Sequence, residues 1–333
     1  MANYQTPGVY IREESKIPPS VAAVATAIPG FVGYTLKAEL ADGSSAAGKP
    51  VRITSLLEYE AIFGGPYEQA FTATLTDGSN ATTISISPVP MQLFYANGGG
   101  TCYVVSAGSY TDTDAIAHGK LKDGLHELEK IDEITLINIP EIVKLAIADR
   151  KPLNEAMLDH CAKMENRFAL LDVLQETGTP FDNAQDFRNK EVGIDNLKFG
   201  AAYYPELVTT LRHFYSDDSV AIQDNRTTGV YPGGSTLDTV KKGDGSAIFP
   251  DTTLYNQITA ELDKYLVKLY PSSSMAGTYA RVDATRGVWK APANMYFANG
   301  GGPCWIVPVG VYALANATVD SGALTDGLET LEK

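Results

Sequence analysis

From residue 101 onward, the apolar residues recur alternately with a period of two and a period of 3.6, which indicates strands alternating with helices. We expect strands at residues 102–108, 134–140 and 167–174, and helices at residues 114–130 and 153–166. Parallel strands need crossover connections, so this alternation predicts a largely parallel sheet covered by helices. The expected fold class is α/β, or mixed α+β: a layered sheet-and-helix core with loop-rich insertions and an extended amino-terminal arm.

Two segments have the clearest helical pattern. In residues 153–166 the apolar stripe consists of Leu153, Ala156, Met157, His160, Cys161 and Met164. In residues 252–269 it consists of Leu254, Ile258, Leu262, Leu266 and Leu269. Residues with this spacing lie on one face of a helix, and we therefore expect a helix over each segment that packs against a sheet.

The composition changes along the chain and predicts four regions. They are an extended amino-terminal arm (1–20), the start of the core (21–100), the main α/β domain (101–294) and a partial second copy of residues 94–130 (295–333). Within the start of the core we expect a strand at residues 21–35, a short helix at residues 55–65 and a polar surface excursion at residues 65–90.

The length and charge of the chain exclude several classes of function. The 333 residues are 44% hydrophobic and carry a net charge of −14. A chain of this length buries a sizeable core, whereas binding to nucleic acid or to an anionic membrane requires clustered Lys and Arg, which the sequence lacks. No apolar run has the length of a signal peptide or a membrane span. We therefore expect a protein that is soluble at synthesis and binds neither nucleic acid nor membranes. The three cysteines are too few and too scattered for a disulfide framework, which favours a reducing cytoplasm.

Two similar glycine loops, FYANGGGTCYVV at residues 94–105 and YFANGGGPCWIV at residues 296–307, are the most distinctive local feature. Successive backbone N–H groups in such a loop can bind phosphate, so one alternative is an α/β nucleotide-binding hydrolase that uses Gly98–Gly100. A phosphate-binding loop opens a helix, however, whereas this loop leads into an apolar strand. We therefore interpret Asn97, Gly98, Gly99 and Gly100 as a structural turn that uses a positive φ.

Residue types that carry out catalysis or bind metals show no recognised pattern. The histidines (His118, His126, His160 and His213) form no HExxH or HxH motif, and the cysteines (Cys102, Cys161 and Cys304) form no CxxC pair. His160 and Cys161 are adjacent, but neighbours on a helix point in different directions and are poorly placed to share a proton. We predict no catalytic residue, no metal ligand and no cofactor, and we interpret Cys102 and Cys304 as buried apolar residues.

Seven stretches within residues 5–294 follow one another in a recognisable order. They are TPGVYIREE, AIPGFVGYT, ITSLLEYEAIFGG, LFYANGGGTCYVV, the pair LHELEKIDEITLINIPE and NRFALLDV, VGIDNLKFGAAYYPEL, and AGTYARVDATRGVWKAPAN. In this order they resemble the sheath proteins of contractile phage tails and of related contractile injection systems. Seven matches in order are far more specific than any one of them.

The resemblance implies a structural protein rather than an enzyme. Sheath proteins stack as rings or helical strands around a rigid inner tube and contract when a baseplate triggers them, without a nucleotide. The implied partners are other copies of the chain, sheath paralogues, an inner tube protein, and baseplate and terminator proteins. The implied location is the cytoplasm during assembly, and then a phage virion or another contractile particle inside or outside the cell.

The resemblance also implies a role for the amino-terminal arm. In this family, terminal strands of one subunit add to a sheet of the neighbouring subunit and keep the subunits linked. The matching residues at the subunit interface are Pro7, Gly8, Val9, Tyr10 and Ile11. In a strand, Val9 and Ile11 lie on one face and Tyr10 lies on the other.

The sequence departs from the family pattern after residue 294. A sheath protein is expected to continue into a carboxy-terminal domain, but this chain restarts at MYFANGGGPCWIVPVG, and its GALTDGLETLEK is similar to GKLKDGLHELEK at residues 119–130. A repeat architecture needs at least three stackable units, so we interpret residues 295–333 as a joined piece of a related sheath protein. A third function, a receptor-binding or surface-layer module, would be β-rich throughout, which the predicted helices contradict.

Overall fold

The core of the protein is a six-stranded sheet in the order β2-β5-β1-β6-β7-β8. The computed structural model describes residues 26–65, 71–76, 79–84, 98–110, 116–175, 179–226, 230–245, 247–264 and 266–288. The strands are β1 (Pro29–Thr35), β2 (Val51–Ile53), β5 (Cys102–Ser109), β6 (Leu136–Asn138), β7 (Phe168–Asp172) and β8 (Gly200–Tyr203). All neighbouring strands are parallel except β2, which is antiparallel to β5. The predicted α/β class is confirmed.

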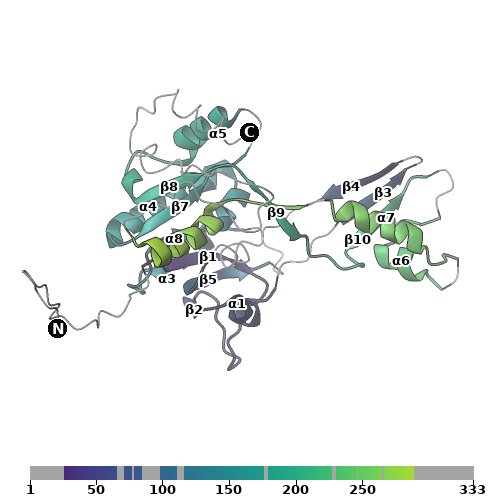
Figure 1. Cartoon of the computed structure of the whole chain (residues 1–333), viewed down its shortest axis with the longest axis horizontal. Coiled ribbons are helices and arrows are strands. Elements are labelled where there is room, and N and C mark those ends of the chain that lie inside the picture. Colours follow the sequence, from purple (N-terminus) through teal and green to yellow (C-terminus); the bar gives the residue numbers. More distant parts are fainter. Residues whose placement is uncertain are drawn as a thin grey trace, which may run out of the picture.

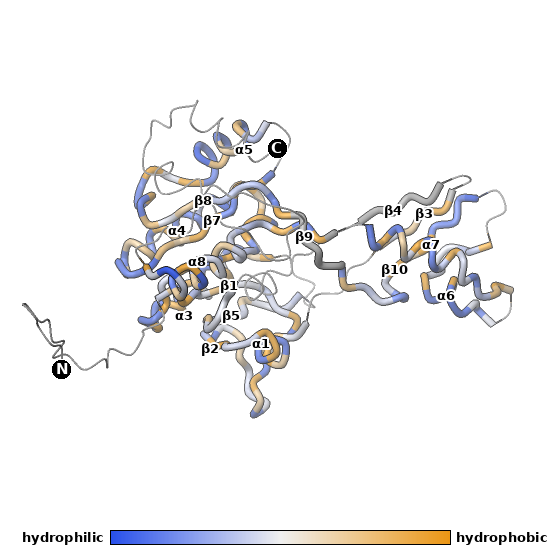
Figure 2. Tube along the Cα trace, viewed as in Figure 1, coloured by the Kyte–Doolittle hydropathy of each residue, from blue (hydrophilic) through white to orange (hydrophobic). Residues whose placement is uncertain are grey.

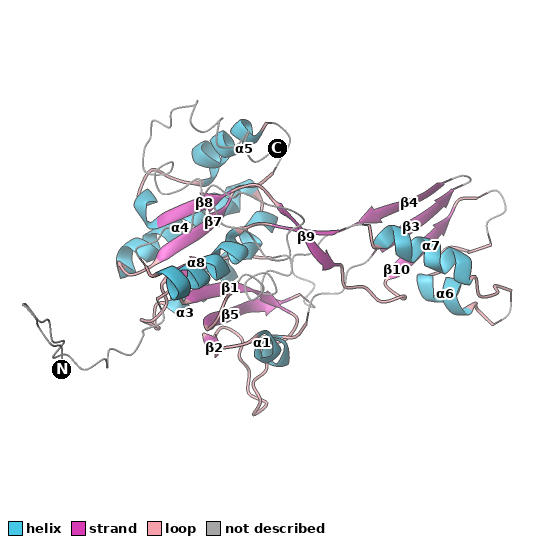
Figure 3. Ribbon diagram, viewed as in Figure 1, coloured by secondary structure: helices cyan, strands magenta, loops and turns pink. Residues whose placement is uncertain are grey.

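Helices cover both faces of this sheet (Figures 1 and 3). One face packs against α3 (His118–Leu128) and α4 (Ile147–Met164), and the other packs against α1 (Leu56–Phe63) and α8 (Ser272–Arg286). Successive residues of a strand point to opposite faces, so Val32 lies in the cluster with α3 and α4, and Phe31 lies in the cluster with α1 and α8. The core therefore has three layers.

Short helical segments complete the connections of the core. The 3-10 helix η1 (Pro140–Lys144) follows β6. Between β7 and β8 the chain forms α5 (Pro180–Asp186), the π-helix η2 (Phe187–Glu191) and the 3-10 helix η3 (Leu197–Phe199). Buried apolar residues from this connection join the cluster that contains α3 and α4, so it covers the same face of the sheet.

The helix predicted at residues 153–166 is confirmed as α4, but it begins at Ile147. Its added turns contain Arg150, whose Nη1 lies 3.1 Å from Oε1 of Glu191. Asn154 also donates a hydrogen bond from Nδ2 to the Glu191 carbonyl at 3.0 Å. Buried polar contacts therefore hold the start of α4, and apolar periodicity does not reveal contacts of this kind.

The single helix predicted at residues 252–269 is wrong in its second part. The helix α7 (Thr252–Leu262) ends at Leu262, and residues Leu266–Leu269 form strand β11, which is antiparallel to β9 (Leu207–Arg212). Val267 and Leu269 are buried and alternate with a period of two. A short apolar run fits both the helical and the extended period, so the pattern alone did not distinguish them.

A second body, to the right in Figure 1, contains a three-stranded sheet and two helices. Its elements are β3 (Phe71–Thr76), β4 (Ser79–Ile84), β10 (Val220–Asp224), α6 (Leu237–Lys242) and α7. The described part of the expected surface excursion thus forms a hairpin that pairs with β10, and Phe71, Ala73 and Leu75 are buried. Figure 2 shows apolar residues in both bodies, in keeping with a separate buried cluster in each.

Strands β9 and β11 form one of the links between the two bodies. The chain passes from β8 through β9 to β10, and it returns from α7 through β11 to α8. Because β9 and β11 pair with each other, the outgoing and returning segments form a two-stranded ribbon. The predicted arm at residues 1–20 and the second copy at residues 295–333 lie outside the described residues.

Candidate functional site

The predicted glycine turn lies directly before β5. Gly98 is exposed and has a φ of +98°. A Cβ atom on Gly98 would lie only 2.9 Å from Cβ of Arg281 in α8, so both the backbone and the available space require glycine there. Asn97 lies outside the described residues.

The position of this turn in the sheet argues against a nucleotide site. In open α/β sheets, ligands bind beyond the carboxyl ends of the strands, where successive connections pass to opposite faces. Here the connection after β1 contains α1 on one face, and the connection after β5 contains α3 on the other face. The corresponding point is at the carboxyl ends of β1 and β5, whereas Gly98–Gly100 lies at the amino end of β5.

A buried polar cluster occupies the carboxyl ends of β1 and β5. Glu141 of η1 accepts hydrogen bonds at Oε1 from the Tyr110 hydroxyl at 2.8 Å and from the Tyr34 backbone N–H at 3.3 Å. A Cβ atom on Gly33 would lie 2.6 Å from Oε2 of Glu141, so the glycine makes room for the carboxyl group. This cluster joins β1, β5 and η1 at the place where enzymes with an open α/β sheet bind their ligands.

Burial affects both charged groups of this cluster. It raises the pKa of Glu141, and it lowers the pKa of Lys144, although the two groups favour each other's charged form. Lys144 Nζ lies 5.1 Å from the centre of the Tyr110 ring.

A second carboxylate at the carboxyl edge, Asp172 at the end of β7, holds the start of α8. It accepts hydrogen bonds from the backbone N–H of Ser272 at 2.9 Å and from the Ser272 hydroxyl at 2.5 Å. Burial raises the pKa of Asp172 to about 7, although both hydrogen bonds favour the ionised form. Next to it, the Ser273 hydroxyl donates to Oδ1 of Asn138 in β6 at 3.4 Å. These contacts fix α8 to the ends of two strands.

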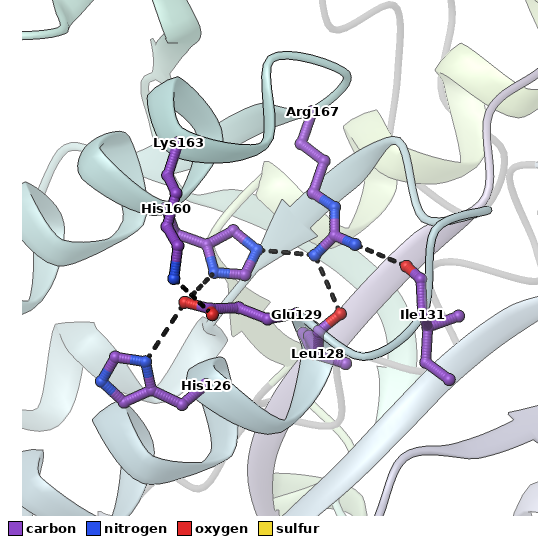
Figure 4. Close-up of polar contacts among 7 residues, drawn as sticks. All are labelled: His126, Leu128, Glu129, Ile131, His160, Lys163 and Arg167. Atoms are coloured by element: carbon purple, nitrogen blue, oxygen red, sulfur yellow. Dashed lines mark hydrogen bonds and ion pairs between the residues drawn. The ribbon is translucent and has the colours of Figure 1, made fainter.

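At the amino ends of the parallel strands, Arg167 directly precedes β7 and binds the carboxyl end of α3 (Figure 4). Its Nη1 donates to the Leu128 carbonyl at 2.9 Å, and its Nη2 donates to the Ile131 carbonyl. The last carbonyl groups of a helix lack partners within the helix and carry partial negative charge, which a guanidinium group satisfies. Arg167 Nη1 also lies 2.7 Å from Nε2 of His160, which accepts the hydrogen bond as a neutral imidazole.

Glu129 connects this Arg167 cluster to the surface. Its carboxylate lies 2.6 Å from Lys163 Nζ and 3.3 Å from His126 Nδ1, and Oε1 lies 3.9 Å from His160 Nδ1 (Figure 4). The Lys163 hydrogen bond is the main reason that the pKa of Glu129 is lowered. The cluster as a whole joins the end of α3 to the end of α4.

The adjacent His160 and Cys161 do not form a reactive pair. Burial, reinforced by the Arg167 charge, lowers the pKa of His160 to about 4. Burial raises the pKa of the Cys161 thiol to about 12. A nucleophilic cysteine needs a thiolate and a base that can take its proton, and both shifts act against this. The geometry agrees with the prediction that these residues belong to a packed helix face.

The other predicted histidines lie apart. His118 Nδ1 is 3.1 Å from Oδ1 of the half-exposed Asp149, and the His213 ring packs edge-on against Phe71 in the second body. Within the part of the chain that the structure describes, no three His, Cys, Asp or Glu side chains gather so as to hold a metal ion. Every helix among the described residues is too short or too polar to cross a lipid bilayer.

The sequence did not indicate the three residues that organise these clusters, Glu141, Asp172 and Arg167. Each is a single charged residue beside a short apolar strand, and such residues are normally solvated. Their signal lies in topology: the ends of parallel strands meet at one edge of a sheet, together with helix termini that need hydrogen-bond partners. A strand-flanking charge next to a predicted helix end is thus a candidate for burial.

Comparisons with known proteins show which fold this is. No protein-family model and no curated protein sequence matches the chain. In structure, the chain is similar to a chain of the anti-feeding prophage (AFP) baseplate in the contracted state, with a TM-score of 0.50 and 20% sequence identity, over 90% of this chain and 61% of that chain.

Two sheath structures are also similar. They are the AFP helical sheath in the contracted state, with a TM-score of 0.46 and 22% identity over 95% of this chain and 61% of that chain, and the sheath complex of the extracellular contractile injection system PVC in the contracted state, with a TM-score of 0.42 and 21% identity over 98% of this chain and 60% of that chain. The chain thus spans about three fifths of the length of the structures it matches. It shares its fold with the AFP baseplate chain.

Proposed function

We propose that this chain is a structural subunit of a contractile sheath, which polymerises around an inner tube and contracts to drive the tube through a target envelope. The observation that carries the proposal is the fold shared with a chain of the contracted AFP baseplate over 90% of the present chain. The seven ordered sequence stretches within residues 5–294 support the same family independently of the fold.

The buried clusters support a structural rather than a catalytic role. Glu141, Asp172 and Arg167 each join separate elements of the core through their hydrogen bonds. His160 and Cys161 have pKa values that oppose nucleophilic catalysis. The energy for contraction would come from exchange between two packings of the subunits, which requires no bound nucleotide.

The proposed partners follow from this role. They are other copies of the chain, sheath paralogues, an inner tube protein, and baseplate and terminator proteins, and the particle would assemble in the cytoplasm. Pro7–Ile11 would add a strand to a sheet of the neighbouring subunit. The alternative, a nucleotide-binding hydrolase, would need Gly98–Gly100 to bind phosphate from the amino edge of the sheet, which is not the edge that open α/β sheets use.

Electron microscopy of the purified chain tests the proposal. We expect regular tubes or rings from the full chain and none after deletion of residues 1–19, while the circular dichroism spectrum stays the same. Val9→Pro is the milder variant, because proline removes one backbone donor from a strand, and Ala2→Pro in the same arm is its control. A small closed oligomer that binds ATP or GTP tightly, and loses this binding on substitution of Gly99, would establish the hydrolase instead.

A further inference from the structure

The second copy of the glycine loop and helix can be compared position by position with the first, because the structure describes the first copy from Gly98 to Leu128 apart from residues 111–115. In the first copy, β5 pairs with β1 along residues 30–35 of β1. Helix α3 packs over both strands, in the cluster that contains Val32 and Val105. We call this flank of β1, which receives β5 and α3, the β1 site.

Three glycines of the first copy lie where the β1 site and α8 leave no room for a side chain. The distances from a Cβ built on each glycine to the nearest atom are 2.9 Å for Gly98 (to Arg281), 2.6 Å for Gly108 (to Tyr34) and 2.5 Å for Gly124 (to Val32). The second copy has glycine at all three equivalent positions, Gly300, Gly310 and Gly327. It therefore meets the tightest steric requirements of this site.

The second copy keeps the residues that correspond to the buried face of α3 and differs at exposed positions. The buried residues of α3 are Leu121, Gly124, Leu125 and Leu128, and their equivalents are identical: Leu324, Gly327, Leu328 and Leu331. Three exposed residues, Lys120, Lys122 and His126, are replaced by Ala323, Thr325 and Glu329. These differences are at exposed positions of α3, so a helix with the sequence of the second copy would have the same apolar face as α3.

The residues of the second copy that correspond to β5 would fit the same site less well. Ser106 is buried, and its hydroxyl lies 2.6 Å from that of Thr35 in β1. Its equivalent, Pro308, has neither a hydroxyl nor a backbone N–H. Val104, also buried, becomes Ile306, which adds a methylene to a packed layer. The first copy is consequently the stronger occupant.

The length of the chain allows the second copy to reach this site in the same molecule. Gly98 touches Arg281 of α8, so the position that Gly300 would take adjoins α8 itself. The helix ends at Arg286, about 8 Å further along its axis. The 14 residues from Arg286 to Gly300 (300 − 286) span up to about 45 Å when extended. Tethering also gives the segment a high effective concentration at the β1 site.

We propose that residues 296–331 are a second, weaker occupant of the β1 site in the same chain, and that they bind there when residues 98–128 are displaced. The chain thus contains a replacement for one strand and one helix of its own core. This inference does not depend on sheath assembly, and its tests use the isolated full chain.

A disulfide bond to position 32 shows directly which of the two copies occupies the β1 site. A Cβ on Gly124 would lie 3.7 Å from Cβ of Val32, which is within the range that a disulfide requires, about 3.5–4.5 Å. The variant V32C/G124C therefore tests whether the first copy occupies the β1 site, and it should form a bridge on oxidation. The variant V32C/G124V/G327C displaces the first helix, because a Cβ at position 124 already lies 3.4 Å from Cγ1 of Val105 and 3.7 Å from Cβ of residue 32, which leaves no room for the two methyl groups of valine. It should form a bridge between positions 32 and 327 within one chain.

Peptide mass spectrometry identifies the bridged residues in the presence of Cys102, Cys161 and Cys304. Absence of the 32–327 bridge in V32C/G124V/G327C, under conditions where V32C/G124C is fully bridged, would overturn the proposal. A bridge found only between two chains would overturn it too, because the proposed occupant belongs to the same chain.

Thermal unfolding provides a second readout without cysteines. We expect Gly124→Val to retain a cooperative melting transition and G124V/G327V to lose it, because the second substitution removes the replacement. Gly327→Val alone should leave the melting temperature unchanged. Equal loss of the transition in G124V and in G124V/G327V would contradict the proposal.

Discussion

The carboxylate of Asp172, at the end of β7, accepts hydrogen bonds from both the backbone N–H and the hydroxyl of Ser272, the first residue of α8, at 2.9 Å and 2.5 Å. The hydrogen bonds and the partial positive charge of a helix amino terminus favour the ionised carboxylate. Burial opposes them and is the larger effect, so the pKa rises from 3.8 to about 7. The contact that holds α8 on the sheet therefore titrates near neutral pH.

We predict that Asp172 makes the stability of the protein depend on pH between about 4 and 7. The folded state binds the proton more tightly than the unfolded state, so the contribution is fully present below the unfolded pKa and is lost as the pH rises through the folded pKa. A shift from 3.8 to about 7 corresponds to at most about 4 kcal/mol. Urea unfolding of the wild type and Asp172→Asn across this range measures it, because asparagine can still accept the Ser272 N–H.

The stability advantage of the wild type over Asp172→Asn should be greater at pH 5 than at pH 8. Asp123→Asn, on the exposed side of α3, controls for the change in net charge. A difference between wild type and Asp172→Asn that stays constant from pH 4 to pH 8 would show that burial does not control this carboxyl group.

The glycine turn before β5 predicts a contrast between two neighbouring substitutions. Gly98→Ala places a side chain at a φ of +98° and within 2.9 Å of Arg281, and we expect it to cost about 1–3 kcal/mol of unfolding free energy. Gly100→Ala is the matched control, because a Cβ there meets nothing within 4 Å. Urea denaturation of both variants measures their unfolding free energies, and we expect a lower value for Gly98→Ala. Equal stability of the two would show that the turn tolerates a side chain.

The Arg167 cluster predicts that the buried Arg167 contributes far more to the free energy of unfolding than the exposed Lys163. Arg167→Met leaves the Leu128 and Ile131 carbonyls and His160 without their donor, and we expect a loss of about 2–4 kcal/mol. Lys163→Met removes an ion pair to Glu129 from a side chain that is 64% exposed, and we expect a loss of about 0–1 kcal/mol. Chemical denaturation measures both, and similar losses would contradict a capping role for Arg167.

The parts of the core that the sequence predicted are those in which packing and periodicity agree. Residues 102–108 and 153–166 have apolar patterns long enough to identify a period, and both became elements that bury one or both faces. Residues 266–269 were assigned to the wrong element because four residues do not distinguish the two periods. The hairpin of β3 and β4 was missed because its Thr- and Ser-rich sequences, FTATLT and SNATTI, contain few large apolar residues.

The polar clusters could not be predicted for a different reason. Glu141 and Tyr110 lie 31 residues apart in the sequence, and Asp172 and Ser272 lie 100 residues apart. Such pairs depend on strand order, which local patterns do not encode. The fold class therefore followed from the sequence, whereas the residues that fasten its layers followed only from the arrangement of the sheet.

Truncation after Asn294 provides the last prediction: the shortened chain should fold as well as the full chain. The buried residues of the three large clusters lie between Ile28 and Ala276, and the β1 site is filled by β5 and α3. Residues 295–333 are then a replacement with no place to enter in the intact core. We expect melting temperatures that agree within about 2 °C, since a change of 1 kcal/mol shifts the melting temperature of a large domain by about 2–4 °C. Circular dichroism and size-exclusion chromatography measure this outcome.

The truncated chain with Gly124→Val is the sensitised control and should not fold, because no second copy is left to replace the displaced helix. Aggregation of the truncated chain itself would show that residues 295–333 complete the core rather than duplicate one of its parts.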